Sequence, residues 1–196
     1  MSRTESGIDA GPGNETETVG PADRALVPTL RRLGNLIPLL TLQAAEATGL
    51  PIALAAAVLA QESGGGRNEW GHDPTIFAGG YDRAHAVDYG AIVTKPAYLA
   101  YRAERGPTGT GGMQGVGPCQ LTYFALQDRA DALGGCWAIV PNLRVGFEEL
   151  VSLIRREGLT AGVAAYNGRG EGAERYAQVV LSRADTYARA LARPYR

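Results

Sequence analysis

Residues 52–63 read Ile-Ala-Leu-Ala-Ala-Ala-Val-Leu-Ala-Gln-Glu-Ser, and three glycines follow at once at positions 64–66. This is the most apolar helical stretch of the chain. Good helix formers fill it, and the glycines that follow are expected to end it. Its one charged residue, Glu62, stands where the helix opens into the glycine loop. Desolvation by an apolar helix disfavours the carboxylate anion, so Glu62 can remain a proton donor near neutral pH. From this stretch alone, a plainer interpretation is favoured, in which Glu62 is a helix-end residue in solvent.

The composition of the whole chain favours a mainly α-helical fold. Its 196 residues suit a single domain with a sizeable core, and 45% of them are apolar. Aromatic residues make up only 7%, and runs of β-branched residues are scarce. We therefore expect close-packed helices joined by glycine-rich loops, with little or no β structure.

The first 24 residues differ in composition from the rest. They contain five acidic residues and two arginines, almost no large apolar side chains, and no apolar core of the kind a signal peptide requires. Such a segment cannot bury enough surface to fold. We expect a disordered tail or linker over 1–24 and a single domain over 25–196.

Charge and hydropathy argue against two classes of partner. The formal net charge of −1 gives no long-range attraction to nucleic acid or to an anionic membrane. The apolar runs at 36–42 and 50–60 are too short to span a bilayer. We expect neither nucleic-acid binding nor direct membrane insertion.

Helical spacing of apolar residues predicts further helices on either side of residues 52–63. Expected helices cover about 25–48 (with breaks at Pro28, Gly34 and Pro38), 96–105, a segment from about 121, 142–157, 160–166 and 171–192. In the helix over 142–157, the residues expected to face inward are Val145, Leu150 and Leu153 or Ile154. In the helix over 171–192, they are Ala173, Tyr176, Val180 and Tyr187. Cys119 and Cys136 lie 17 residues apart, which allows either one disulfide or two buried thiols.

Three later segments carry polar groups beside glycines. In Gly115-Val-Gly-Pro-Cys-Gln-Leu-Thr122, Gly117 allows close backbone approach to a ligand, and the Gln120 amide can donate and accept hydrogen bonds. In Pro141-Asn-Leu-Arg-Val-Gly146, the asparagine suits a helix cap and the glycine tight helix packing, without a catalytic role. In Ala164-Ala-Tyr-Asn-Gly168, the aromatic ring and the amide suit ligand contacts. Each segment read alone also fits an ordinary turn or helix end.

The order of these segments after Glu62-Ser63 resembles the soluble lytic transglycosylase and goose-type lysozyme group, over roughly residues 40–190. The resemblance implies a lysozyme-like helical fold with a cleft for the alternating GlcNAc–MurNAc chain of peptidoglycan, and no cofactor. By position, it implies that Glu62 is the catalytic acid and that Ser63 and Tyr166 support it. The implied substrate-binding residues are Gly117, Gln120, Thr122 and Asn167.

The chain departs from this group between Glu62 and Gln120, where an insertion is apparent across about 79–112. Within it, Tyr98 and Tyr101, with Leu99, are at helical spacing and are expected to form a small packing face, with a lid over the cleft as the alternative. The turn after Asn167 differs as well, because Gly168-Arg-Gly-Glu171 stands where many relatives have a proline.

Either one or two carboxylates could perform the expected reaction. Hydrolysis with inversion needs a second carboxylate to activate water, and the candidates are Asp73, Asp82 and Asp88. A lytic transglycosylase needs one, because the C6 hydroxyl of muramic acid is the nucleophile and is held close by the substrate itself. Each of these aspartates also suits a turn in solvent, so the transglycosylase reaction is favoured.

His72 and His85 raise the question of zinc, but they lack the spacing of a known ligand motif, and we expect no metal. The predicted function is a muramidase that cuts the MurNAc–GlcNAc β-1,4 bond, acting as a monomeric domain, alone or attached to other modules. Without a signal peptide, it would be an endolysin released through a phage holin or a part of a virion. The alternative is a catalytically silent module that binds glycan or builds a virion.

Overall fold

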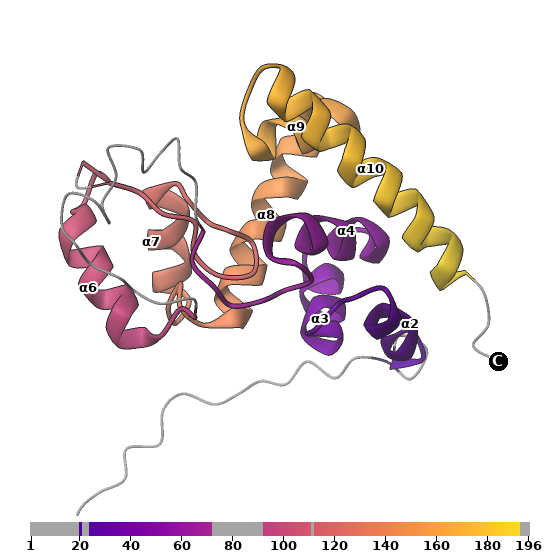
Figure 1. The fold of residues 1–196 in the computed structure, drawn as a ribbon, viewed down its shortest axis with the longest axis horizontal. Helices are drawn as coiled ribbons and strands as arrows, with labels where there is room; N and C mark the ends of the chain where they lie inside the picture. Colours follow the sequence, from indigo (N-terminus) through magenta and orange to yellow (C-terminus); the bar gives the residue numbers. More distant parts are fainter. Residues whose placement is uncertain (1–19, 21–23, 72–91, 111, 193–196) are drawn as a thin grey trace, which may run out of the picture.

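The computed structural model describes residue 20 and residues 24–71, 92–110 and 112–192 (Figure 1). Within these ranges the chain forms helices α2 (Val27–Arg32), α3 (Pro38–Thr48), α4 (Ile52–Ser63), α6 (Lys95–Arg105), α7 (Phe124–Ala132), α8 (Ile139–Glu157), α9 (Leu159–Asn167) and α10 (Glu171–Leu191). Bridge pairing in the described residues is limited to two isolated contacts, Glu69 with Ile92 and Trp70 with Val116. The prediction of a mainly α-helical fold is confirmed. The expected tail over 1–24 lies almost wholly outside the described residues.

Helix ends follow the glycines and prolines of the sequence. Gly49 ends α3 and Gly64 ends α4, both in the left-handed conformation that favours glycine. The expected break near Gly34 divides the first helical stretch into α2 and α3. Helix α8 begins at Ile139, three residues earlier than expected, so that Pro141 lies in its first turn.

Helix α4 is buried between two neighbouring helices. It contacts α3 and, more extensively, α10, while α8 contacts α3, α7 and α9. Ala55, Ala57 and Leu59 of α4 are completely buried, as its apolar sequence predicts. In Figure 1, α6 and α7 lie together on one side of the molecule, α9 and α10 form the other side, and α8 runs between them.

The expected inward faces of the later helices are largely confirmed. Val145, Leu150 and Leu153 of α8 are buried, and Ile154 is only partly so. On α10, Ala173, Tyr176 and Val180 are buried, and Tyr187 packs against the core while remaining partly exposed.

Tyr98 and Tyr101 of α6 are fully buried and their rings lie 6.1 Å apart, so they form a packing face as predicted. Leu99 does not belong to it, because this residue is on the exposed side of the helix.

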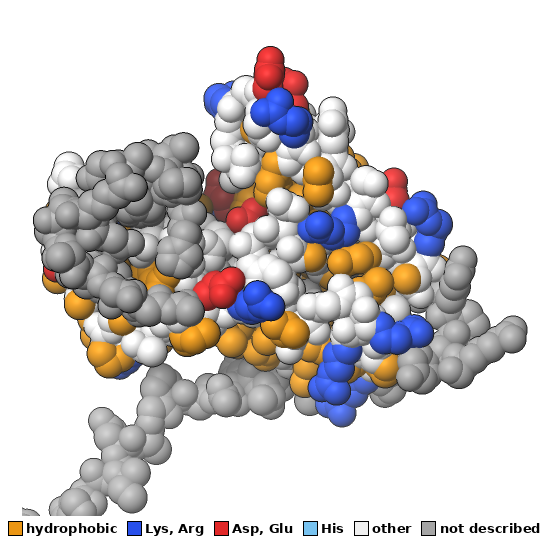
Figure 2. Space-filling model, in the orientation of Figure 1, with side chains coloured by type: hydrophobic (Ala, Val, Ile, Leu, Met, Phe, Trp, Pro, Cys, Tyr) orange, Lys and Arg blue, Asp and Glu red, His pale blue; other side chains and the backbone are white. Residues whose placement is uncertain are grey.

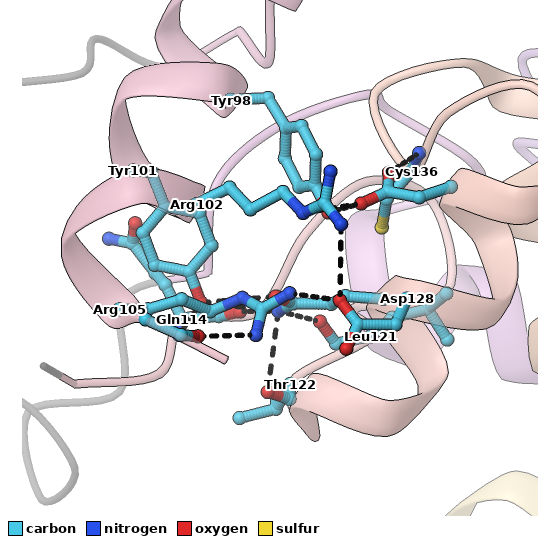
Figure 3. A network of polar contacts seen from close by, with 12 residues as sticks. Tyr98, Tyr101, Arg102, Arg105, Gln114, Leu121, Thr122, Asp128 and Cys136 are labelled. Carbon is cyan, nitrogen blue, oxygen red and sulfur yellow. Dashed lines mark hydrogen bonds and ion pairs between the residues drawn. The ribbon is translucent and has the colours of Figure 1, made fainter. Parts of the chain in front are cut away.

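A polar network around the buried Arg105 holds α6 against α7 (Figure 3). Arg105, which is 1% exposed, donates to Asp128 Oδ1 at 2.5 Å, and Tyr98 donates to Asp131 Oδ2 at 2.9 Å. Arg102 adds an ion pair to Asp131 at 3.0 Å. Because a buried charge is costly without a partner, these pairs fix the position of α6 on α7.

The same network reaches the loop that precedes α7. The Tyr101 hydroxyl accepts a hydrogen bond from the backbone N–H of Gln114 at 2.8 Å. The Gln127 amide nitrogen donates to the carbonyls of Gln114 at 2.9 Å and Leu121 at 2.8 Å. Helix α6 lies in the predicted insertion, so part of that insertion helps to hold residues 114–121 in place.

Cys119 and Cys136 are free thiols, both buried, which is the second of the two predicted alternatives. Among the helices described, none has the length and apolar character needed to cross a membrane.

Candidate active site

A cleft of about 810 Å³ lies where the end of α4 meets α7, α8 and α9. Its walls are formed by Glu62, Gly71, Gly115, Gln120, Leu121, Thr122, Tyr123, Ala125, Leu126, Arg129, Glu149, Leu153, Ala165, Tyr166 and Asn167. Figure 2 shows acidic side chains in the hollow beside the part of the surface formed by α9 and α10. The cleft brings together five of the predicted site residues: Glu62, Gln120, Thr122, Tyr166 and Asn167. Ser63 and Gly117 are not among the residues that line it.

Glu62 occupies the last turn of α4 at the wall of the cleft. Burial raises the pKa of its carboxyl group from 4.5 to about 7, and a hydrogen bond from Tyr176 partly opposes this rise. The cause is desolvation, which penalises the anion more than the neutral acid. At neutral pH the group is therefore divided between its protonated and ionised forms, as a residue that both gives and takes a proton requires.

Tyr176 of α10 is the direct partner of Glu62. Its hydroxyl donates to Glu62 Oε1 at 2.5 Å, and burial raises the pKa of Tyr176 so that it keeps its proton. Helical spacing predicted that Tyr176 faces inward. Nothing in the sequence connects it with Glu62, because 114 residues separate the two.

Ser63 supports the end of α4 through the backbone. Its hydroxyl donates to the carbonyl of Pro118 at 2.7 Å and accepts from the N–H of Gly66 at 3.1 Å. The first bond ties the residue after Glu62 to the loop that forms the cleft floor, and the second closes the turn that follows α4. The support that the resemblance implies for Ser63 is, in this structure, a link between two segments of backbone.

Gln120 shapes the floor of the cleft with a backbone φ of 49°, in the left-handed region. Its Nε2 donates to the carbonyls of Glu69 at 3.1 Å and Gly117 at 2.9 Å, so its amide N–H groups are used inside the protein. Its Oε1 lies so close to Gly71 and Gly115 that a Cβ at either position would be within 2.5 Å of it. Of the two predicted ligand contacts, donation by the amide N–H groups is therefore not available, because both bond to backbone carbonyls. Gln120 still lines the cleft, and acceptance of a hydrogen bond from a ligand by Oε1 stays a prediction.

Gly117 and Asn142 form one buried unit behind the floor. Gly117 has a φ of 72°, and a Cβ there would lie 2.6 Å from Asn142 Nδ2. Asn142 Oδ1 accepts from the N–H of Cys119 at 2.9 Å, and its Nδ2 donates to the carbonyl of Val116 at 2.8 Å. Asn142 thus connects α8 to the loop instead of capping a helix as predicted. Because Gly117 has no side chain, it leaves room for the Asn142 amide.

Tyr166 and Asn167 reach the cleft from the end of α9. The Tyr166 hydroxyl donates to the carbonyl of Cys119 at 2.9 Å. Burial is the main cause that raises the pKa of Tyr166, and the charge of nearby Glu62 adds to it. A Cβ on Gly146 would lie 3.1 Å from the same hydroxyl, so the predicted tight packing at Gly146 is confirmed. Thr122 also lines the cleft, with its hydroxyl donating to the carbonyl of Gln120 at 3.1 Å.

An ion pair that the sequence did not predict lies between the α7 and α8 walls of the cleft. Arg129 contacts Glu149 at 3.3 Å and Glu148 at 3.1 Å. Glu149 is therefore a second carboxylate in the cleft, but its charge is matched by a guanidinium.

The predicted candidates for a second catalytic carboxylate, Asp73, Asp82 and Asp88, lie outside the described residues, as do His72 and His85. In the part of the chain that is described, no three His, Cys, Asp or Glu side chains are grouped so that they could hold a metal ion.

No family model matches the chain, and comparisons with curated proteins and with solved structures gave no match. A function for the chain therefore has to be inferred from the site itself.

Proposed function

We propose that this protein is a peptidoglycan muramidase that cleaves the MurNAc–GlcNAc β-1,4 bond as a lytic transglycosylase. The observation that carries the proposal is the Glu62 carboxyl group, with a pKa of about 7, at the wall of an open cleft. A glycosidic oxygen is a poor leaving group until it is protonated, and an acid with this pKa is still substantially protonated at neutral pH. The cleft volume lies within the range of about 300–1,000 Å³ that is usual for ligand sites.

The proposed reaction uses Glu62 twice. The neutral acid first gives its proton to the glycosidic oxygen as the bond to C1 of MurNAc breaks. The carboxylate then takes the proton from the C6 hydroxyl of the same sugar, whose oxygen bonds to C1 and closes a 1,6-anhydro ring. Between the two steps the anion accepts a hydrogen bond from Tyr176, and such bonds are stronger when the acceptor is charged. The cycle needs no cofactor, because the proton returns to Glu62.

The one-carboxyl reaction needs no second carboxylate to activate water. Among the described residues, Glu149 also lines the cleft, but it is held in an ion pair with Arg129 at 3.3 Å, which favours the one-carboxyl reaction over hydrolysis by Glu149. A silent glycan-binding module is the less favoured alternative, since such a module has no use for a desolvated carboxyl group. We further propose that the protein acts on the bacterial wall, released through a phage holin or carried on a virion.

The test is Glu62→Gln in a clearing assay on purified peptidoglycan. Loss of a general acid typically costs about 10²–10⁴-fold in rate, so we expect activity to fall by at least about 100-fold. Glu46→Gln, an exposed substitution on α3, should leave the rate unchanged. Clearing by Glu62→Gln within a few-fold of the unmodified protein would overturn the assignment.

Mass spectrometry of the released fragments separates the two reactions. Anhydro-muramic ends are the expected product of the unmodified protein. Reducing muramic ends would instead show hydrolysis, with water as the nucleophile.

A further inference from the structure

Among the described residues of the cleft wall, Tyr123 is the one aromatic residue that is mostly exposed. It lines the cleft and is 53% exposed, whereas the other tyrosine of this wall, Tyr166, is held against Cys119. A single exposed aromatic residue elsewhere on the surface would need no explanation. Inside a cleft that also holds Glu62, an uncovered ring is a surface available to a ligand.

The ring of Tyr123 has a fixed support. Its centroid lies 4.6 Å from that of Phe124, with the two planes tilted by 48°. Its backbone carbonyl accepts hydrogen bonds from the N–H groups of Leu126 at 3.0 Å and Gln127 at 3.2 Å, as α7 begins. The buried Gln127 is itself anchored through its amide to Leu121. The position of Tyr123 is therefore set before a ligand arrives, which lowers the entropy lost on binding.

The neighbours of Tyr123 in the cleft supply hydrogen-bonding groups. The Thr122 hydroxyl donates to a backbone carbonyl and keeps its lone pairs to accept from a ligand. Asn167, an exposed amide on α9, lines the same cleft. A flat apolar ring in a cleft that also offers a hydroxyl acceptor and an amide matches the two kinds of surface of a pyranose. The C–H face of such a sugar covers an aromatic ring, and its hydroxyl and acetamido groups point outward to polar partners.

We propose that Tyr123 is a sugar-binding platform on which one N-acetylhexosamine ring of the substrate stacks. This inference rests on the proposed function, because it takes the ligand of the cleft to be a glycan. Tyr123 binds the chain and holds it in register, while Glu62 performs the proton transfers.

The experiment measures binding apart from catalysis. Peptide-free GlcNAc–MurNAc strands are titrated by calorimetry into a Glu62→Gln parent and into the same parent carrying Tyr123→Ala, Tyr123→Phe or Leu133→Ala. Stacking of a ring on an aromatic side chain predicts roughly a 10-fold weaker Kd for Tyr123→Ala. Tyr123→Phe keeps the ring and should remain within about 2-fold of the parent. Leu133→Ala is the matched control, because Leu133 is 44% exposed, follows the other end of α7 and lies outside the cleft wall.

The outcomes separate this inference from the proposed function. A parent that binds the strands, with Tyr123→Ala binding equally well, overturns the platform and leaves the proposed function standing. Equal losses for Tyr123→Ala and Tyr123→Phe also overturn stacking, because the hydroxyl would then make the contact. A parent that binds no strands, together with an unmodified protein that releases no fragments from peptidoglycan, defeats the proposed function and the platform with it. Circular dichroism of every variant confirms that the fold is retained.

Discussion

Replacing Glu62 with glutamine is expected to stabilise the protein at alkaline pH and to leave its stability nearly unchanged in acid. The carboxyl group has a pKa of about 7 in the folded state and an ordinary value of 4.5. Ionisation is therefore easier in the unfolded chain than in the native protein. The unmodified protein loses stability as the pH rises from 4.5 to 7, because only the unfolded state gains from releasing the proton over that range.

The size of this stability change follows from the rise in the pKa of Glu62. Each pKa unit corresponds to about 1.36 kcal/mol, so a rise from 4.5 to about 7 costs about 3 kcal/mol of unfolding free energy above pH 7. Glutamine has the same shape as the protonated acid and cannot ionise. Its Oε1 can also still accept the hydrogen bond from Tyr176. For a chain of this size, about 3 kcal/mol corresponds to a rise in Tm of roughly 6–12 °C.

The assay is urea unfolding of the two proteins at half-unit steps from pH 4 to pH 9. The difference in unfolding free energy should grow from about pH 4.5, with a slope near 1.36 kcal/mol per pH unit, and level off above pH 7. Other carboxyl groups titrate in both proteins, so they cancel in this difference. Glu46→Gln, at an exposed position, is the matched control. A difference that is the same at every pH would refute the desolvation of Glu62 and, with it, the basis of its role as an acid.

Two further substitutions test the surroundings of Glu62 and of the cleft floor. Tyr176→Phe removes the hydrogen bond that lowers the pKa of Glu62, so this pKa should rise further. The substitution should therefore destabilise the protein more at pH 9, where Glu62 is ionised, than at pH 5, and the difference should be about 1–2 kcal/mol. Urea unfolding at both pH values measures this, and equal losses would show that Tyr176 does not stabilise the anion. Asn142→Ala leaves the buried N–H of Cys119 and carbonyl of Val116 without their partner, at a cost of about 3 kcal/mol or more. Denaturant unfolding should show no comparable loss for Asn167→Ala, and a loss below about 1 kcal/mol for Asn142→Ala would contradict the bridge.

The helices were predictable because glycines and prolines close to their ends mark where they begin and stop. The apolar run of α4 has glycines at its C-terminal end, and the structure ends the helix at Ser63 as the sequence indicates. Prolines and Gly34 likewise divide α2 from α3. Such signals act within a few residues, so a single sequence contains them in full.

The contacts that complete the site were not predictable in the same way. Tyr176 meets Glu62 only because α10 packs on α4, and no spacing rule connects residues so far apart. Gln120 was expected to serve a ligand, yet its amide nitrogen bonds to backbone carbonyls. Every residue carries such a carbonyl, so the sequence gives no sign of which one will be the partner. Asn142 differs from its predicted role as a helix cap for the same reason.

Because Glu62 and Tyr176 are far apart in the sequence, the ribosome synthesises them at different times. A ribosome completes α4 long before it reaches residues 171–191, which form α10. Until α10 packs on the end of α4, the Glu62 carboxyl group lacks its Tyr176 partner and part of its cover from water, so its pKa lies closer to the ordinary 4.5. Under the proposed function, the proton donor is therefore complete only when the last helix docks.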